Sequence, residues 1–232
     1  MASTIQRLFF SIAYFQIGFF TFSSAQIINE SKADSLIYII LTEDLSDTSR
    51  YKVAMEIADY TTIPRISIKY SHEALDIARR LDNPMRQAAA WINNSKTHKK
   101  LGEIEKAFKA AFQSISYYQL AGSKIGVASG SLVLGDIYAR QENFPQASQY
   151  YNKSIGIFRE EKDDSRLATA LLNASEVYEE NLQYDSAFIL LQEAKSLFNK
   201  LDFEVGEAYT IGNLGLLEIE KEEIERGEKN MN

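Results

Sequence analysis

Apolar positions recur along this chain with a spacing of forty residues. One column of small residues is Ala88, Ala128, Ala168 and Ala208. Two more small-residue columns follow the same period: Ser67, Ala107, Ala147 and Ala187, then Ala74, Ser114, Ser154 and Ala194. Large residues occupy another phase, at Pro64, Ile104, Phe144, Tyr184 and Ile224. A period of roughly 20–50 residues is typical of a solenoid, in which one supersecondary unit is stacked several times. The small residues are expected where two elements cross closely.

Each unit predicts two helices. In the second unit, Asn83 suits an N-cap, Pro84 suits the first helical position, and an apolar-rich run continues as far as Gly102. A second apolar-rich run covers residues 104–120. Further breaks are predicted near residues 142–143, 162–164, 181–182 and 202–203. Because the connections are short, the two helices of a unit should be antiparallel neighbours.

The period divides the chain into successive segments. Residues 26–46 are a lead-in helix that caps the stack, and the units are 47–83 (degenerate), 84–123, 124–163, 164–203 and a partial fifth unit at 204–232. The first helix of this fifth unit is expected to end near Glu222, with the second starting near Ile224. The sequence stops at Asn232, so this unit is either a worn terminal repeat or part of a longer protein; we favour the latter.

The first 25 residues have the pattern of a signal peptide. Arg7 precedes an apolar run over residues 8–22, and small residues follow at Ser23 and Ala25. Cleavage near Ala25–Gln26 would export the mature chain to the periplasm or cell envelope. A retained membrane anchor is the alternative, but the apolar run is shorter than the ~20 residues that a spanning helix needs. We therefore expect no membrane insertion of the mature chain.

Composition narrows the function classes. A net charge of −7 and a pI of about 5.1 argue against nucleic acid as a partner, because phosphate binding needs a basic excess. The chain has no cysteine, and neither His72 nor His98 has a second histidine four positions away, as a metal-binding helix would require. No phosphate-binding loop or dinucleotide-binding glycine pattern occurs. An enzyme and a cofactor are therefore not expected.

Three stretches, residues 91–114, 131–154 and 171–194, resemble the tetratricopeptide repeat. The matching positions are Trp91, Gly102, Leu134–Gly135, Leu214–Gly215, Tyr138, Tyr178, Ala107, Ala147 and Ala187. The usual period is about 34 residues, so the forty-residue period here indicates longer helices. Glu142 and Leu182 replace the turn glycine, and His98 and Glu218 replace the tyrosine. The resemblance implies an all-α, right-handed α-α superhelix whose first helices line an inner groove that binds a protein or peptide.

Two patterns fall on the groove positions that this resemblance implies. Asn93, Asn173 and Asn213 share one phase and could form a ladder that hydrogen-bonds an extended peptide backbone; alternatively, they bond their own neighbours. The second pattern is a charge gradient from Lys96, Lys99 and Lys100, through Asp136 and Arg140, to Glu176, Glu179 and Glu180. Such a gradient would set the direction of a bound peptide. The alternative is a solvated face.

The sequence thus predicts a non-enzymatic protein- or peptide-binding scaffold. The alternative keeps the fold and makes the chain the sensor region of a membrane-bound signalling protein. Its output domain, a histidine kinase, nucleotide cyclase or transcriptional regulator, would lie beyond residue 232. The oligomeric state is left open.

Overall fold

The computed structural model describes residues 29–231, with side-chain surroundings as far as Lys221. The predicted signal peptide lies outside these residues. A helix over residues 29–42 comes first. It is followed by α2 (Asp47–Tyr60), α3 (Pro64–Arg80), α4 (Pro84–Lys100), α5 (Ile104–Leu120), α6 (Lys124–Arg140), α7 (Phe144–Glu160), α8 (Asp164–Glu180), α9 (Tyr184–Lys200) and α10 (Glu204–Met231). No strand occurs in this part of the chain, and none of its helices is long and apolar enough to cross a bilayer.

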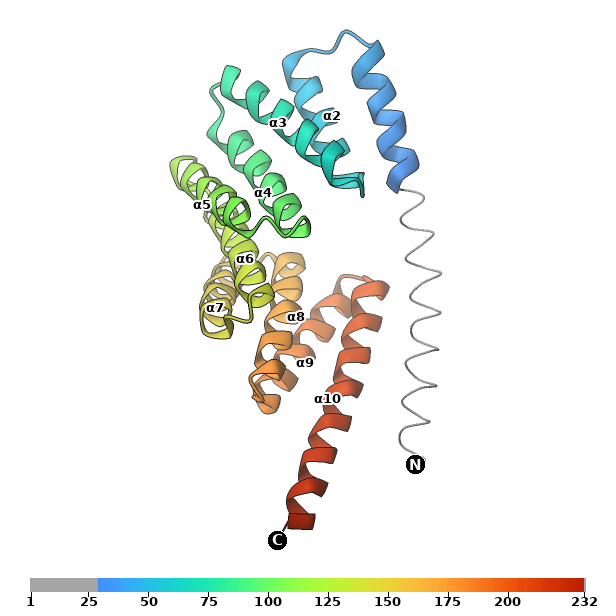
Figure 1. Cartoon of the computed structure of the whole chain (residues 1–232), viewed down its shortest axis with the longest axis vertical. Coiled ribbons are helices and arrows are strands. Elements are labelled where there is room, and N and C mark those ends of the chain that lie inside the picture. Colours follow the sequence, from blue (N-terminus) through green and yellow to red (C-terminus); the bar gives the residue numbers. More distant parts are fainter. Residues whose placement is uncertain (1–28, 232) are drawn as a thin grey trace.

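The helices are packed as successive antiparallel hairpins, which follow one another along an arc (Figure 1). Neighbouring units also contact each other through their first helices: α2 contacts α4, α4 contacts α6, and α6 contacts α8. Because the first helices approach one another in this way, the stack curves with them on its inner side. The predicted α-α superhelix is therefore confirmed.

The regularity comes from a turn that repeats every twenty residues. Helices α3 to α9 have 17 residues each, and each following turn contains one residue with positive φ. These residues are Asp82, Gly102, Gly122, Glu142, Lys162, Leu182 and Asp202. The backbone N–H of the residue after the positive-φ residue donates to a carbonyl in the last turn of the helix; for example, Glu103 N donates to His98 O at 2.9 Å. This geometry ends each helix and satisfies its free carbonyls.

Side-chain caps distinguish the two helices of a unit. Ser46, Asn83, Ser123 and Asp163 precede α2, α4, α6 and α8, and each accepts a hydrogen bond from the backbone N–H three residues later. The second helices α3, α5, α7 and α9 have no side-chain cap bond. Such a cap contributes about 1 kcal/mol to the free energy of unfolding, so the inner helices have the better-defined start.

The small-residue columns are buried in the packed stack, with one exception. Ala88, Ala128 and Ala168 are fully buried, and the other two columns are buried as well, from Ser67 to Ala194. The exception is Ala208 on α10, which is exposed. Its exposure shows that the last helix has a face with no covering neighbour among the described residues.

The break predicted near residue 222 is absent, and that expectation is wrong. α10 continues as one helix from Glu204 to Met231. The stretch from Glu220 to Ile224 reads Glu-Lys-Glu-Glu-Ile, which has neither a glycine nor an N-cap residue, and most of its residues favour helix. In the earlier units, packing of the second helix offsets the cost of a positive φ at a non-glycine residue.

Candidate functional site

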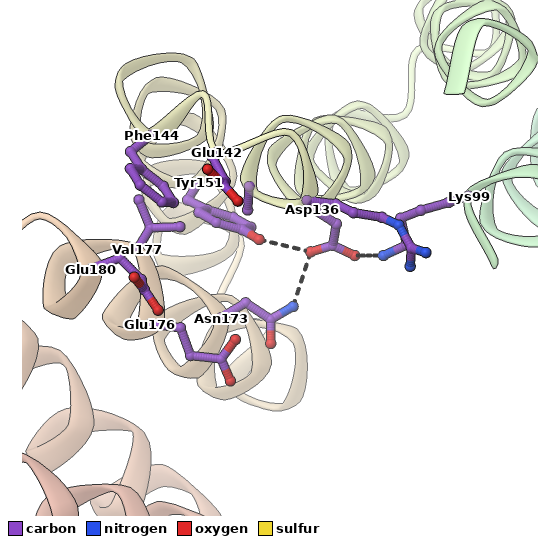
Figure 2. A pocket seen from close by; sticks show the side chains of 11 residues that line it. Lys99, Asp136, Glu142, Phe144, Tyr151, Asn173, Glu176, Val177 and Glu180 are labelled. Atoms are coloured by element: carbon purple, nitrogen blue, oxygen red, sulfur yellow. Dashed lines mark hydrogen bonds and ion pairs between the residues drawn. The ribbon is translucent and has the colours of Figure 1, made fainter. Parts of the chain in front are cut away.

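The inner side of the stack is organised around Asp136 on α6. Its carboxylate accepts hydrogen bonds from Lys99 Nζ at 2.7 Å, Tyr151 Oη at 3.0 Å and Asn173 Nδ2 at 3.1 Å. Figure 2 shows these three side chains converging on it from α4, α7 and α8. The Lys99 and Asp136 side chains are only 23% and 20% exposed, so the ion pair is screened less than a surface pair.

A glycine allows Tyr151 to reach this carboxylate. A Cβ atom at Gly135 would lie 2.6 Å from the Tyr151 ring, so only glycine lets the ring lie against α6. Burial, and then the negative charge of Asp136, raise the pKa of Tyr151. The hydroxyl therefore stays protonated and acts as a hydrogen-bond donor. The Leu134–Gly135 motif seen in the sequence thus has a direct role in building the site.

A cavity of about 680 Å³ lies beside this network. It is lined by Lys99, Asp136, Ala139, Arg140, Glu142, Phe144, Tyr151, Asn173, Glu176, Val177 and Glu180. Carboxylates and apolar groups therefore occur together, with Phe144, Val177 and Glu180 on the same side (Figure 2). Such a mixture suits a ligand group with an aliphatic part and a charged end.

Uncompensated negative charge collects on α8 at the edge of the cavity. Burial raises the pKa of Glu176, and the nearby Asp136 and Glu180 raise it further. The pKa of Glu179 is raised in the same way, by burial first and then by Glu220, Glu180 and Glu176. Within the described residues, no ion pair involves Glu176, Glu179 or Glu180. This side of the groove is electrostatically suited to a cation.

Six of the eleven groove residues named from the sequence line the cavity. They are Lys99, Asp136, Arg140, Asn173, Glu176 and Glu180. Lys99 is paired with Asp136, so its charge is neutralised within the protein. Glu179 lies just beyond the lining, among the carboxylates of α8 and α10.

The remaining lysines lie towards α2. Lys96 and Lys100 are exposed and close to Asp59. Burial raises the pKa of Asp59, and the two lysines and Asn93 offset part of that rise. Glu56 is also near Asp59. The N-terminal end of the groove is therefore of mixed charge, where the sequence suggested a basic end.

The three asparagines have different surroundings. Asn93 is only 6% exposed and lies beside Asp59. Asn173 donates to Asp136, and Asn213 is half-buried on α10. Two of the amides thus face carboxylates of this chain, and a peptide-binding ladder stays a prediction.

Sequence reasoning missed the central role of Asp136. Lys99, Asp136 and Asn173 are each 37 residues apart, on three successive first helices. The sequence signal that could have predicted this network is a cation, a carboxylate and an amide at a constant spacing. This spacing differs from the forty-residue period because the contacting residues hold different positions within their own repeats. No group of three or more His, Asp or Glu side chains in the described residues is placed to hold a metal ion.

Comparison with known proteins agrees with this architecture. Residues 126–200, which span α6 to α9, match the tetratricopeptide repeat family. No curated protein matches the sequence. Similar solved structures include BtubC (BKLC) from P. vanneervenii, with 12% identity, a TM-score of 0.58, and coverage of 86% of this chain and 92% of that one.

Two further similar structures are Rap proteins. The apo form of RapI has 18% identity and a TM-score of 0.61, over 88% of this chain and 81% of that one. A Rap protein complexed with Competence and Sporulation Factor has 14% identity and a TM-score of 0.62, over 90% and 75%. The fold therefore defines a helical solenoid of antiparallel hairpins. The match to the tetratricopeptide repeat family over residues 126–200 agrees with the resemblance drawn from the sequence.

Proposed function

We propose that this protein is a non-enzymatic scaffold that holds a protein or peptide on its concave side, with a lysine or arginine of the partner in the Asp136 cavity. The predicted signal peptide would place this activity in the cell envelope. The observation that carries the proposal is the cavity of about 680 Å³, whose carboxylates on α8 have no cationic partner among the described residues.

The charges favour a cationic ligand group. Lys99 already neutralises Asp136, so a further cation would meet Glu176 and Glu180. Burial and the neighbouring Asp136 and Glu180 disfavour the charged form of Glu176, and a bound ammonium or guanidinium would relieve that repulsion. Phe144 and Val177 would contact the aliphatic part of the same side chain.

The rigidity of the cavity wall and the concave shape of the stack also favour binding of a protein or peptide. The Asp136 network ties four helices together, so the cavity wall is ordered before a ligand arrives, which lowers the entropic cost of binding. Solenoids of stacked repeats present extended concave surfaces that are used for recognition. The similar Rap protein complexed with Competence and Sporulation Factor supports this role by analogy of fold.

Selection from a random peptide library tests the proposal. Phage-displayed random peptides would be selected on the immobilised chain and on the double variant Glu176→Gln, Glu180→Gln, which keeps side-chain size but removes both charges. We expect the chain to enrich peptides containing lysine or arginine, and the variant to lose this enrichment.

A matched control is Glu105→Gln with Glu160→Gln, on the outer helices α5 and α7, where both carboxylates are exposed. This variant should select the same peptides as the unchanged chain. Equal lysine and arginine enrichment on all three proteins, or no enrichment on any, would contradict the proposal.

A further inference from the structure

The junction between the first and second units differs from the later junctions in the described part of the chain. Each later junction, α5 with α6, α7 with α8 and α9 with α10, contains a layer of four buried and mainly apolar side chains. These layers are Ala107, Ala111, Leu134 and Ile137; Ala147, Tyr151, Ala174 and Val177; and Ala187, Leu191, Leu214 and Leu217. The forty-residue period places Ser67, Ser71, Asn94 and Thr97 at the same positions between α3 and α4. We call these four residues the polar layer.

Hydrogen bonds take the place of apolar contacts in the polar layer. Its four side chains are at most 5% exposed. Ser71 Oγ donates to Asn94 Oδ1 at 2.6 Å, and a second hydrogen bond joins Ser67 Oγ and Thr97 Oγ1 at 2.8 Å. When a junction separates, such bonds are exchanged for bonds to water, whereas apolar side chains lose their hydrophobic stabilisation. Separation therefore costs less free energy between α3 and α4 than at the later junctions.

Two buried N–H donors at this junction favour separation further. Asn94 Nδ2 and Trp91 Nε1 on α4 have no acceptor among the described residues. Trp91 packs with Ala90 against the apolar cluster of α2 and α3, so both donors lie at the contact between the two units. A buried donor without an acceptor destabilises the closed junction, and water would satisfy it once the junction opens.

The other contacts that attach the first unit to α4 are also polar. Tyr51 Oη on α2 donates to Arg86 O at 3.0 Å, and the Arg86 guanidinium lies 5.2 Å from the centroid of the Tyr51 ring. In contrast, Ala88 and Ile92 on α4 belong to the apolar cluster that continues into α5 and α6. Interfaces between bodies that move relative to each other are more polar than permanent ones. The apolar core thus ties α4 to the second unit.

We propose that the stack opens at the polar layer between α3 and α4. Residues 29–80 would move as one body and residues 84–231 as another, with residues 81–83 as the hinge. Opening would carry Asp59 on α2 away from the lysines of α4 that lie close to it. The Asp136 network joins α4, α6, α7 and α8, which all belong to the second body, so it would stay intact. The inference does not depend on the proposed function.

Thiol labelling tests the opening directly, because the chain has no cysteine of its own. Ser71→Cys places a thiol in the polar layer, and Ala111→Cys places one at the equivalent position of the next junction. Ala187→Cys, in the layer between α9 and α10, controls for fraying at an end of the stack. The reaction of each full-length variant with DTNB is followed by absorbance without denaturant. We expect the Ser71→Cys variant to react at least about tenfold faster than the other two.

Adding Asn94→Leu to each of the first two variants tests the role of the polar layer. Leucine is close to asparagine in size, removes the unpaired donor and is the residue found at the equivalent Leu134. It should slow labelling of the Ser71→Cys variant by about tenfold and leave the Ala111→Cys variant unchanged. Circular dichroism shows that each variant is folded. The comparison of the three single-thiol variants needs no substitution at Asn94.

The urea dependence of labelling separates hinge opening from unfolding of the first unit. A hinge exposes little surface, so labelling of the Ser71→Cys variant should rise much less steeply with urea than global unfolding does. An equally steep rise would overturn the inference. So would equal rates for Ser71→Cys and Ala187→Cys, or no slowing by Asn94→Leu. The library selection depends on Glu176 and Glu180, so its failure would be separate from failure here.

Discussion

The hydroxyl of Tyr151 on α7 donates to Oδ1 of Asp136 on α6 at 3.0 Å. Tyr151 is 3% exposed, so this bond links the apolar packing of one repeat to the polar wall of the cavity. The same carboxylate holds Lys99 and Asn173 from the units on either side. The carboxylate of Asp136 therefore both links the helices and forms part of the cavity wall, so we expect substitutions here to change stability and the shape of the cavity together.

Replacing Tyr151 with phenylalanine should lower the free energy of unfolding by about 1–2 kcal/mol. The change removes a buried donor to a charged acceptor while keeping the ring. Urea unfolding followed by circular dichroism measures it. Tyr150→Phe is the control, since the Tyr150 ring stacks on Tyr138 and should keep that contact, with a loss below about 0.5 kcal/mol. Equal losses in the two variants would show that the hydrogen bond does not stabilise the fold.

Gly135 and Gly215 occupy the same position of the repeat and should respond in opposite ways to alanine. At Gly135 the new methyl group would meet the Tyr151 ring at 2.6 Å, and we expect a loss of about 1–3 kcal/mol. At Gly215 nothing lies within 4 Å, so alanine should stabilise α10 by about 0.5–1 kcal/mol through its higher helix propensity. Thermal and urea unfolding of both variants provide the test. A loss at Gly215 would mean that the α10 face is covered in solution.

Leu182→Gly should stabilise the protein, even though it removes an apolar side chain. Leu182 is 70% exposed and has a φ of 58°, a conformation that costs a residue with a Cβ about 1–2 kcal/mol. Glycine removes this cost but adds unfolded-state entropy, so a net gain of about 0.5–1 kcal/mol is expected. Gly102→Ala, at an equivalent turn with φ of 75°, should lose about 1 kcal/mol. Opposite signs in the two urea midpoints are the expected result, and a lower midpoint for Leu182→Gly would contradict it.

Glu176 and Glu179 should make the protein less stable as the pH rises. Their folded-state pKa values lie above the ordinary 4.5, mainly because of burial and then because of neighbouring carboxylates. Between 4.5 and the raised values the folded state binds more protons than the unfolded state, so the free energy of unfolding falls with rising pH in this window. Above the window this destabilisation is fully present.

The variant Glu176→Gln, Glu179→Gln should therefore unfold at a higher urea concentration than the unchanged chain at pH 7. The difference between the two proteins should shrink towards pH 4. Glu105→Gln with Glu160→Gln, on the outer helices, serves as the control and should follow the unchanged chain at each pH. A constant difference across the range would show that the two carboxylates do not titrate abnormally in the folded state.

The local structure of the repeats was predictable from the sequence because its causes are local. Asn83 and Pro84 start α4 where the pattern placed them, and Gly102 and Gly122 supply the positive φ at two of the turns. Apart from Ala208, the alanine columns are buried because the forty-residue period returns a residue to the same face of the equivalent helix in the next unit. Leu182 shows the limit of this reasoning. Its positive φ is imposed by the packing of α8 and α9, since leucine itself disfavours that conformation.

The arrangement of side chains in the groove was decided by the tertiary structure. Lys99, Asp136 and Asn173 meet because the rotation from one unit to the next brings positions 37 residues apart to the same height, and no local preference encodes that rotation. The length of α10 also differs from the sequence prediction, since a turn at Glu222 would need a packed second helix to offset its strain. Periodicity along the chain determines helices and their buried faces, whereas charges from separate helices come together only when the stack has formed.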